Sequence, residues 1–256
     1  MTSSIRTERS GAAFIITIDR PEVRNALHPP AHAELAAAFD DFAADDTLAV
    51  AVIRGAGEKA FCVGSDLKYR VETGANPVPP TGFAGLCERY DLAKPVIAAV
   101  NGDAIGGGLE IVLACDLAIA VEGARFGLPE PRIGLCAHGG LHRLARQIPY
   151  KSAALLAFTG RLFGAHEALA MGLLNEVAPR EAFEASVDAL VADVAACAPL
   201  ALQATKEMMH EGLTEPSVEA AFARSYPAYE RMLASEDARE GPRAFMEKRA
   251  PVWRGR

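Results

Sequence analysis

The sequence predicts a mixed α/β protein that ends in a purely helical region. Short runs rich in β-branched residues alternate with helical stretches from Ala12 to about Arg180, which is typical of repeated strand and helix units. Several of these runs are continuously apolar, as strands covered on both faces of a sheet are. Beyond about Arg180 only helical spacing remains. The 256 residues make between one and two domains of ~150 residues, so we expect an α/β core over residues 1–195 and a helical region over residues 196–256.

The elements of the core are predicted from the spacing of apolar residues. Ala31–Phe42 has the spacing of a helix. The stretch Thr73–Gly82 is rich in Pro and Gly and is predicted to be a loop, suited to cover a neighbouring site. Strands are expected at four runs: Phe14–Ile18, Ala49–Arg54, Pro95–Val100 and Leu117–Ala120.

Four amphipathic helices are predicted in the C-terminal part of the chain, with Pro199, Gly212, Pro216 and Gly241-Pro242 as breaks between or within them. Ser235 followed by Glu236 and Asp237 resembles a helix start, because acidic side chains in the first turn complement the helix dipole. Such helices pack either on a neighbouring subunit or on their own core, and both arrangements remain open. The predicted helices are Glu181–Cys197, Pro199–Glu211, Pro216–Ala234 and Ser235–Lys248.

Charge and hydropathy argue against two classes of partner. With 26 basic and 33 acidic side chains the net charge is −7, which disfavours binding to nucleic acid or to an acidic membrane surface. The apolar run Ala12–Ile18 is followed by Asp19 rather than by a small-residue cleavage site. The longest apolar stretch, Ile111–Val121, contains Asp116 and is shorter than the ~20 residues of a membrane span. We therefore expect no nucleic-acid partner and no membrane span.

The cysteines and histidines do not predict a disulfide framework or a metal site. The five cysteines are an odd number, widely spaced and without a C-x-x-C pair, which favours a reducing, cytoplasm-like compartment. His138 and His142 have the i, i+4 spacing of metal ligands, but Gly139 and Gly140 sit between them and the glutamate of a zinc-binding H-E-x-x-H helix is missing. No metal is expected.

Common nucleotide and nucleophile motifs are also missing. The run Gly106-Gly107-Gly108-Leu109-Glu110-Ile111 lacks the last glycine of a dinucleotide fingerprint and the lysine of a P-loop, and its carboxylate would repel a pyrophosphate. Ser65 does not stand in a G-x-S-x-G elbow. We therefore expect no nucleotide cofactor and no esterase-like serine.

Two turns of small residues are candidates for binding an oxygen that gains negative charge. Lys94–Glu110 reads as a strand, a tight turn and a glycine run that opens a helix, where backbone N–H groups approach a ligand closely. Phe61–Lys68 is a second turn from apolar into polar residues. Two backbone donors from separate turns suit one carbonyl oxygen, although glycines also serve tight turns and close helix packing without any ligand.

Glu110 and Glu130 are candidates for acid–base chemistry. Glu110 begins the helix after the glycine run, and Glu130 follows the loop Phe126–Pro129. Either residue alone is most simply an acid placed favourably at a helix end. Beside two candidate oxyanion turns, the pair indicates general acid–base work.

The chain resembles the crotonase superfamily, the enoyl-CoA hydratases and isomerases, over nearly its whole length and in the right order. The matching segments are Asp19–Leu27, Ala60–Lys68, Lys94–Glu110, Cys115-Asp116, Phe126–Arg143 with Gly139-Gly140, and Glu247-Lys248-Arg249. The resemblance implies a spiral of ββα turns and a helical C-terminal region that forms homotrimers, often paired into hexamers.

The same resemblance implies an active site. The backbone N–H groups of Ser65 and Gly107 would form the oxyanion hole, Glu110 would act mainly as base on a water molecule, and Glu130 would protonate the α-carbon of the substrate. Coenzyme A would be part of the substrate, so no separate cofactor is implied. Seven residues would line the coenzyme A pocket or approach it from the C-terminal tail: Arg24, Leu27, Val63, Gly64, Asp66, Phe245 and Lys248. Lys68 and Arg249 are further sources of positive charge for this polyanionic ligand.

The function expected on this basis is hydration of an enoyl-CoA thioester and the reverse dehydration. Three departures from the family pattern are Ser65 in place of alanine, Asp103, and the unusual run Cys136-Ala137-His138. The last of these motivates alternatives within the fold: double-bond isomerisation, hydration of a carnitine-like or aromatic acyl-CoA, or hydrolysis. A non-catalytic RNA-binding protein is a third hypothesis, disfavoured by the acidic charge and by the presence of both glutamates.

Overall fold

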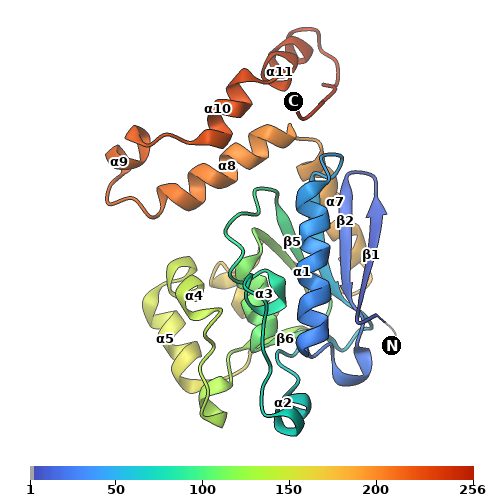
Figure 1. The fold of residues 1–256 in the computed structure, drawn as a ribbon, viewed down its shortest axis with the longest axis vertical. Helices are drawn as coiled ribbons and strands as arrows, with labels where there is room; N and C mark the ends of the chain where they lie inside the picture. Colours follow the sequence, from blue (N-terminus) through green and yellow to red (C-terminus); the bar gives the residue numbers. More distant parts are fainter. Residues whose placement is uncertain (1–2) are drawn as a thin grey trace.

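The computed structural model describes residues 3–256 and consists of an α/β body from which the C-terminal helices extend as an arm (Figure 1). The body contains a six-stranded sheet in the order β1-β2-β3-β5-β7-β10. Only β1 is antiparallel to its neighbour; the other pairs are parallel. The strands are β1 (Ile5–Ser10), β2 (Ala13–Ile18), β3 (Val50–Gly55), β5 (Val96–Val100), β7 (Leu117–Val121) and β10 (Glu176–Ala178).

The central strands are buried because their sequences are apolar on both faces. All five residues of β5 are buried, and its neighbours β3 and β7 are almost entirely so. The outer strand β1 is exposed except at Ile5. The four strands predicted from the sequence are confirmed as β2, β3, β5 and β7, since continuous apolar runs distinguish the centre of a parallel sheet.

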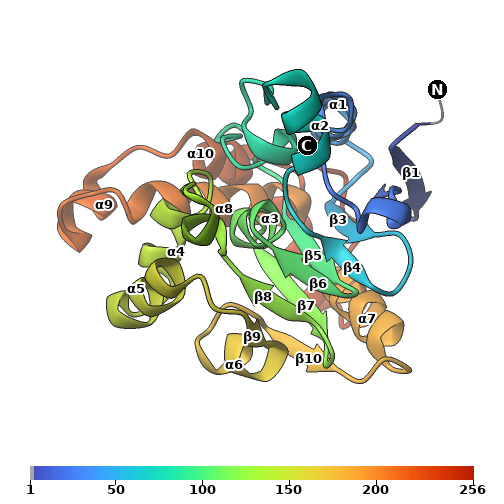
Figure 2. The same cartoon turned by 90° about the horizontal axis from the view of Figure 1, so that it is seen from below.

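A second, four-stranded sheet gives the body its spiral form. Its order is β4-β6-β8-β9, with β4 (Ala60–Cys62), β6 (Asp103–Ile105), β8 (Arg125–Gly127) and β9 (Phe163–Gly164). Each of the first three strands follows a strand of the larger sheet, so that β3–β4, β5–β6 and β7–β8 form successive pairs (Figure 2). A helical segment follows each pair: α2 (Leu67–Thr73), α3 (Gly107–Ala114) and the 3₁₀ turn Glu130–Ile133. The expected spiral of ββα turns is confirmed.

Further helices cover the sheets or lie at the edge of the body. The helix α1 (Pro29–Ala44) confirms the prediction for Ala31–Phe42 and buries Leu35, Phe39 and Phe42 in the core. Beyond the 3₁₀ turn Phe83–Gly85, the remaining helices of the body are α4 (Leu141–Gln147), α5 (Tyr150–Thr159), α6 (Ala165–Ala170) and α7 (Phe183–Ala195). The short 3₁₀ turn Pro21–Val23 precedes α1.

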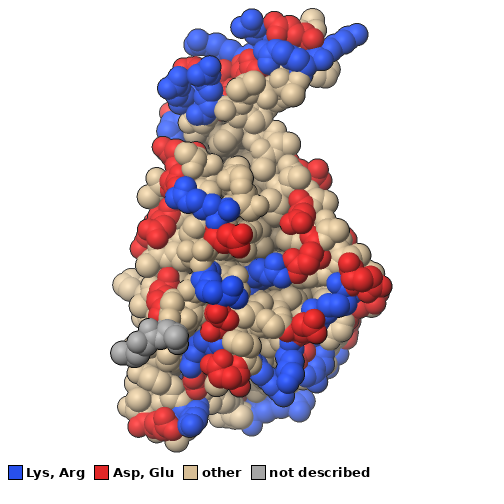
Figure 3. Space-filling view, turned by 90° about the vertical axis from the view of Figure 1, so that its right-hand side faces the viewer, with Lys and Arg blue, Asp and Glu red and all other residues tan. Residues whose placement is uncertain are grey.

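The arm consists of α8 (Pro199–Gly212), α9 (Val218–Ala223), α10 (Pro227–Ala234) and α11 (Asp237–Met246). It projects from the body and overhangs a hollow with few charged side chains (Figure 3). The single helix predicted over Pro216–Ala234 is wrong, because Tyr226 takes an extended conformation before Pro227 and separates α9 from α10. The predicted break at Gly241-Pro242 is also wrong, since α11 runs through it.

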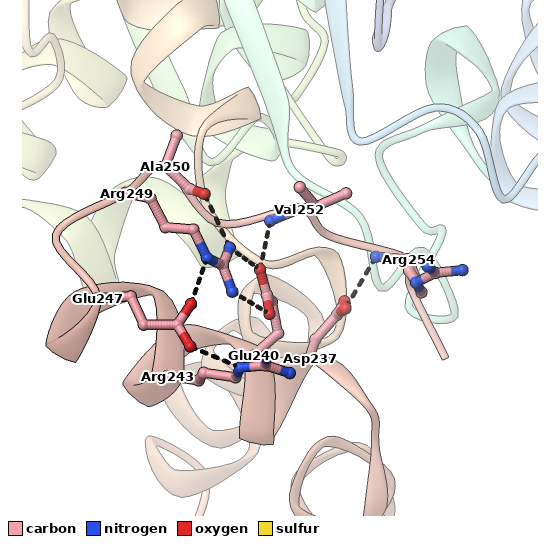
Figure 4. Close-up of polar contacts among 8 residues, drawn as sticks. All are labelled: Asp237, Glu240, Arg243, Glu247, Arg249, Ala250, Val252 and Arg254. Carbon is pink, nitrogen blue, oxygen red and sulfur yellow. Dashed lines mark hydrogen bonds and ion pairs between the residues drawn. The ribbon is translucent and has the colours of Figure 1, made fainter.

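The arm is fixed to the body by polar contacts at its base and by the C-terminal tail. Lys206 on α8 donates to the carboxylate of Asp116 at 2.8 Å and to the carbonyl oxygen of Lys94 at 3.0 Å. The tail folds back on α11, where the Asp237 carboxylate accepts from the backbone N–H of Arg254 and Glu240 pairs with Arg249 (Figure 4). Trp253 Nε1 donates to the carbonyl oxygen of Ala196 at 2.7 Å.

No single helix among residues 3–256 is long and apolar enough to cross a membrane. The pair α7 and α8 meets the length and composition criteria jointly but is bent by 97° between its two members.

Candidate active site

Two backbone turns meet at one side of the body. Leu27 pairs with Ser65 in a parallel bridge, in which the N–H of Leu27 donates to the carbonyl oxygen of Gly64 and the N–H of Asp66 donates to that of Leu27. This ladder uses the groups on either side of Ser65, so the N–H of Ser65 points away from Leu27. Gly107 opens α3, where no preceding turn supplies an acceptor. Neither amide has an acceptor among the described residues.

Glycines bring these two turns into contact. A Cβ atom on Gly64 would lie 3.0 Å from the backbone nitrogen of Gly107, and Gly64 itself has φ +91°. A Cβ on Gly108 would lie only 1.9 Å from the carbonyl oxygen of Cys62, so the first turn of α3 lies directly against the end of β4. Gly64 and Gly108 are therefore required by the close approach of the two backbones.

Glu110 lies one turn into α3 and is almost completely buried, and its Oε1 has no hydrogen-bond partner within residues 3–256. Burial, reinforced by the nearby charge of Glu130, raises its pKa to about 7, while the backbone N–H groups of Gly139 and Gly140 favour the charged form. A Cβ on Gly139 would lie 3.0 Å from Oε2 of Glu110. The Gly139-Gly140 run thus leaves room for this carboxylate.

Glu130 begins the 3₁₀ turn after β8 and is half-buried, and its Oε2 has no hydrogen-bond partner in the described part of the chain. Burial raises the pKa of this carboxyl group as well. A Cβ on Gly106 would lie 2.7 Å from Oε1 of Glu130. Glu130 therefore lies beside the first glycine of the run, whereas Glu110 follows the last glycine two residues later in sequence.

All four residues line one pocket of about 400 Å³. Its walls come from α2, the segment Phe83–Glu88, the start of α3 and the segment Pro129–Gly139. The unusual residues Cys136 and His138 also line it. The pocket brings together Ser65, Gly107, Glu110 and Glu130, together with Val63 and Gly64.

The other residues expected to bind coenzyme A do not line this pocket. Arg24 is exposed at the end of a 3₁₀ turn, and Leu27 is fully buried beneath Ser65. The carboxylate of Asp66 accepts from the N–H of Tyr69 at the start of α2 and pairs with Arg20 at 3.1 Å. Phe245, at the end of α11, and Lys248, just after it, are both exposed on the arm.

Two charged residues that the sequence singled out have structural partners. Asp103 pairs with Arg125 and accepts from its backbone N–H at 3.2 Å, which ties β6 to β8. Arg249 pairs with Glu240 and Glu247 within the arm (Figure 4). Its charge is matched there and is not offered to the pocket.

Phe83, Arg70 and Glu88 line the pocket but were not selected from the sequence. Arg70 lies on α2, and the other two lie in an irregular segment without a recognisable motif. The sequence near Phe83 offers one local signal, the two glycines Gly82 and Gly85. In the structure both glycines have positive φ. Among residues 3–256 no cluster of His, Cys, Asp and Glu has an arrangement suited to a metal ion.

Two amides without an acceptor among the described residues line one pocket with two carboxyl groups whose pKa values are raised, an arrangement suited to an oxyanion hole beside acid–base groups. Such a site suits an enzyme that adds or removes a proton next to a polarised carbonyl group.

Comparison with known proteins gives the family. The family model described as enoyl-CoA hydratase/isomerase matches residues 8–256. A protein of Salmonella typhi named carnitinyl-CoA dehydratase is 42% identical over the full length of both chains. The crystal structure of an enoyl-CoA hydratase from Mycobacterium tuberculosis H37Rv has a TM-score of 0.93 at 38% identity, and that of a carnitinyl-CoA hydratase from Mycobacterium avium has 0.79 at 41% identity; each covers all of both chains.

The chain belongs to the enoyl-CoA hydratase/isomerase family, as the sequence predicted, and it is an enzyme. Hydration or dehydration of an acyl-CoA thioester is the activity that this membership supports.

Proposed function

We propose that the protein is an enoyl-CoA hydratase, which adds water across the 2,3 double bond of an enoyl-CoA and catalyses the reverse dehydration of a 3-hydroxyacyl-CoA. The observation that carries this proposal is the meeting, in one pocket, of the unpaired amides of Ser65 and Gly107 with Glu110 and Glu130. Hydration needs both parts: donors for the thioester oxygen and two carboxyl groups for proton transfer.

The proposed reaction uses each group once. The thioester oxygen accepts hydrogen bonds from the N–H groups of Ser65 and Gly107. The carboxylate of Glu110 takes a proton from water as the water oxygen bonds to the β-carbon, and the electrons of the double bond move onto the thioester oxygen. The carboxyl group of Glu130 then donates its proton to the α-carbon, and the carbonyl group re-forms. Dehydration reverses every step, with Glu130 as base and Glu110 as acid.

The pair of carboxyl groups is tested by single replacements with glutamine. Glu110→Gln and Glu130→Gln should each lower kcat for crotonyl-CoA hydration by ~10²- to 10⁴-fold, because each removes one proton-transfer group. Loss of the conjugated thioester absorbance measures turnover, and circular dichroism checks the fold. Glu122→Gln, at an exposed turn after β7, is the matched control and should keep wild-type activity. Normal turnover in either pocket variant would refute these roles.

A second candidate is hydration and dehydration of an acyl-CoA whose acyl chain carries a cationic group, as in carnitine. The pocket contains three carboxyl groups, those of Glu88, Glu110 and Glu130, against one guanidinium, that of Arg70. Phe83 adds an aromatic ring, and aromatic rings attract quaternary ammonium groups. The names of the carnitinyl-CoA relatives support the same candidate.

Glu88 lines the pocket but takes no part in the proposed proton transfers, so its carboxylate is available to a cationic acyl chain. Phe83 lies against Gly107, whereas a Cβ on Gly139, beside Glu110, would lie 3.5 Å from Cβ of Cys87. The wall formed by this segment therefore runs from the proposed oxyanion hole past Glu110. Glu88 folds back toward the start of this segment: its backbone N–H donates to the carbonyl oxygen of Thr81 at 2.9 Å, and a Cβ on Gly82 would lie 2.9 Å from Cβ of Glu88.

Two substrates of equal shape separate these candidates. We expect the wild type to prefer 4-(trimethylammonio)but-2-enoyl-CoA over its neutral isostere 5,5-dimethylhex-2-enoyl-CoA in kcat/KM. Glu88→Gln should reduce this preference about tenfold, because a tenfold change corresponds to the ~1.4 kcal/mol of a modest charge contact. Glu72→Gln, exposed on α2 outside the pocket, is the control. Equal rates for the two substrates would leave a neutral enoyl-CoA as the substrate.

We also propose that the arm forms a homotrimer or a pair of trimers. Large apolar side chains are exposed along a hollow between α8, α9 and α10, including Leu213 at 85%, Phe222 at 83% and Leu233 at 57%. Apolar side chains gathered in this way on one surface are typical of a protein interface. The exposed positions of Phe245 and Lys248 on the same arm are compatible with a role in the pocket of a neighbouring subunit.

A reducing, cytoplasm-like compartment remains our proposal for the site of action. The five cysteines are free thiols, and three of them, Cys62, Cys87 and Cys115, are buried. A disulfide-forming environment is not needed for this fold.

A further inference from the structure

We propose that His32 is a positioning residue for the oxyanion hole, acting through Phe83 on the backbone of Gly107. This inference rests on the proposed function but concerns a residue outside the pocket. The observations that carry it are a side-chain hydrogen bond, an aromatic contact and a close approach of a ring to a glycine.

His32 lies on the first turns of α1 and is completely buried. Its Nδ1 accepts a hydrogen bond from the backbone N–H of Ala84 at 3.1 Å. Because Nδ1 is an acceptor, the neutral ring carries its proton on Nε2, which has no hydrogen-bond partner among the described residues. Burial, with a smaller effect of His28, lowers the pKa of His32 to about 4, so the ring stays neutral and Nδ1 stays an acceptor at neutral pH.

The backbone of Ala84 is strained, and the hydrogen bond to His32 holds it in this conformation. It has φ 56° and ψ 17°, a left-handed conformation that is costly for a residue with a Cβ atom. Its neighbour Gly85 packs flush on α1, where a Cβ would lie 2.5 Å from Cα of Ala36. The hydrogen bond from Ala84 to His32 thus fixes the turn Phe83–Gly85 against α1.

Phe83 transmits this position to the site. The rings of His32 and Phe83 meet edge to face, with centroids 4.6 Å apart. The outer end of the Phe83 ring lies against Gly107, since a Cβ there would be 2.3 Å from Cζ of Phe83. His32, Phe83 and Gly107 are therefore in series, and the last of them supplies one of the two proposed oxyanion donors. A shift of the ring alters the direction of that donor.

The test compares two variants of His32 with one variant of His28, the residue that precedes α1. His32→Leu occupies the buried space but has no hydrogen-bond acceptor. It should lower kcat for crotonyl-CoA by about 10- to 100-fold, which is less than the ~10²- to 10³-fold effect of losing an oxyanion donor. KM should change by less than about threefold, since binding of the substrate does not require an aligned donor. His32→Asn places an amide oxygen near the position of Nδ1 and should recover much of the lost rate. His28→Asn, at the residue that precedes α1 and whose ring meets that of Tyr69, is the control and should behave as the wild type.

A spectroscopic measurement separates positioning from simple loss of stability. Butyryl-CoA labelled with ¹³C at the thioester carbonyl binds without being hydrated, and hydrogen bonds from the hole lower its carbonyl stretching frequency. We expect His32→Leu to reduce this shift and His32→Asn to keep most of it. A folded His32→Leu protein with wild-type kcat and carbonyl shift would overturn the inference. If His32→Leu does not fold, the test rests on the other two variants. The inference would be overturned if a folded His32→Asn and His28→Asn lost kcat and the carbonyl shift to the same extent.

The same measurements distinguish failure of this inference from failure of the proposed function. A wild-type protein that hydrates no enoyl-CoA contradicts the proposed function. A wild-type protein that is an active hydratase, with variants that leave kcat and the carbonyl shift unchanged, contradicts the role of His32 alone.

Discussion

At the scale of single residues, Glu110 and Glu130 share one pocket. Their two carboxyl groups therefore titrate as a coupled pair. The charge of Glu130 raises the pKa of Glu110, and burial raises the pKa of both groups. Because Glu110 is the more deeply buried, the proton of the singly protonated pair favours Glu110. This arrangement, with Glu130 ionised, is the one that the proposed dehydration direction requires. Hydration uses the same total charge with the proton on Glu130.

The shared proton predicts a bell-shaped pH profile for kcat/KM. Only the singly protonated pair is active in either direction, so activity is lost when both groups ionise and when both are protonated. The pKa of about 7 for Glu110 places the alkaline decline near pH 7. The acid decline follows the raised pKa of Glu130, above its ordinary value of 4.5. Initial rates with crotonyl-CoA from pH 4 to 9, with circular dichroism at each pH, would check this; rates that are flat across pH 7 would contradict it.

Those residues of the candidate site that stand in short sequence motifs could be predicted from the sequence. Glycine runs and their following acids are local features, and Ser65, Gly107, Glu110 and Glu130 do line one pocket. Phe83 and Glu88 could not be found in this way, because their importance comes from a fold that sets an irregular segment against α3. Partners at long range were equally hidden: nothing local to Asp103 indicates that it pairs with Arg125.

At the scale of elements, the position of α3 decides the geometry of the site. Its first turn carries Gly107 and Glu110, and it lies against the end of β4, which precedes Ser65. A single element therefore sets one oxyanion donor and one carboxyl group relative to the other donor. The contact at Gly108 is the tightest between these two backbones, at 1.9 Å from a Cβ to a carbonyl oxygen.

Gly108→Ala should therefore lower both stability and activity. The added methyl group would overlap the carbonyl oxygen of Cys62, and relieving the overlap requires α3 to move, at a cost of about 1–3 kcal/mol in the free energy of unfolding. Activity should fall further than stability explains, because α3 carries Gly107. Gly123→Ala, where a Cβ meets nothing within 4 Å, is the control and should change neither. Thermal unfolding and crotonyl-CoA turnover measure the two effects; an alanine tolerated at position 108 would show that the two backbones are further apart.

Among the elements, the strands of the larger sheet were easier to predict than the helices of the arm. Continuous apolar runs of five or six residues between turn residues are typical of buried parallel strands, whereas the break at Tyr226 depends on one proline that also suits the first turn of a helix. Pro242 shows the opposite case: α11 continues through it, in a segment that the tail braces through Glu240 and through Trp253 against Gly241.

At the scale of the whole molecule, body and arm differ in how their apolar residues are covered. The body encloses one continuous apolar core, while α8 to α10 leave Leu213, Phe222 and Leu233 exposed. The base of the arm is fixed by Lys206 on Asp116 and by Trp253 on Ala196, so the arm holds this apolar surface in a defined place beside the body.

The proposed assembly is tested by introducing charge into this surface. Phe222→Glu should convert a trimer or hexamer into smaller species, because a carboxylate buried at an interface without a partner is strongly disfavoured. Sedimentation velocity would show the change in mass. Phe158→Glu, equally exposed but on α5 of the body, is the control for a charge added outside the arm. A wild-type protein that sediments as a monomer would contradict the proposed assembly.

Because both proposed oxyanion donors are peptide nitrogens, ordinary mutagenesis cannot delete them. An alanine scan across the pocket would remove the side-chain groups of Glu110, Glu130, His138 and Cys136 but neither backbone donor, since every amino acid except proline brings the same N–H group. Replacing the amide by an ester at these two bonds, through incorporation of an α-hydroxy acid, removes one donor and leaves the side chains as they are. Half of this candidate machinery is thus visible only to chemistry performed on the main chain.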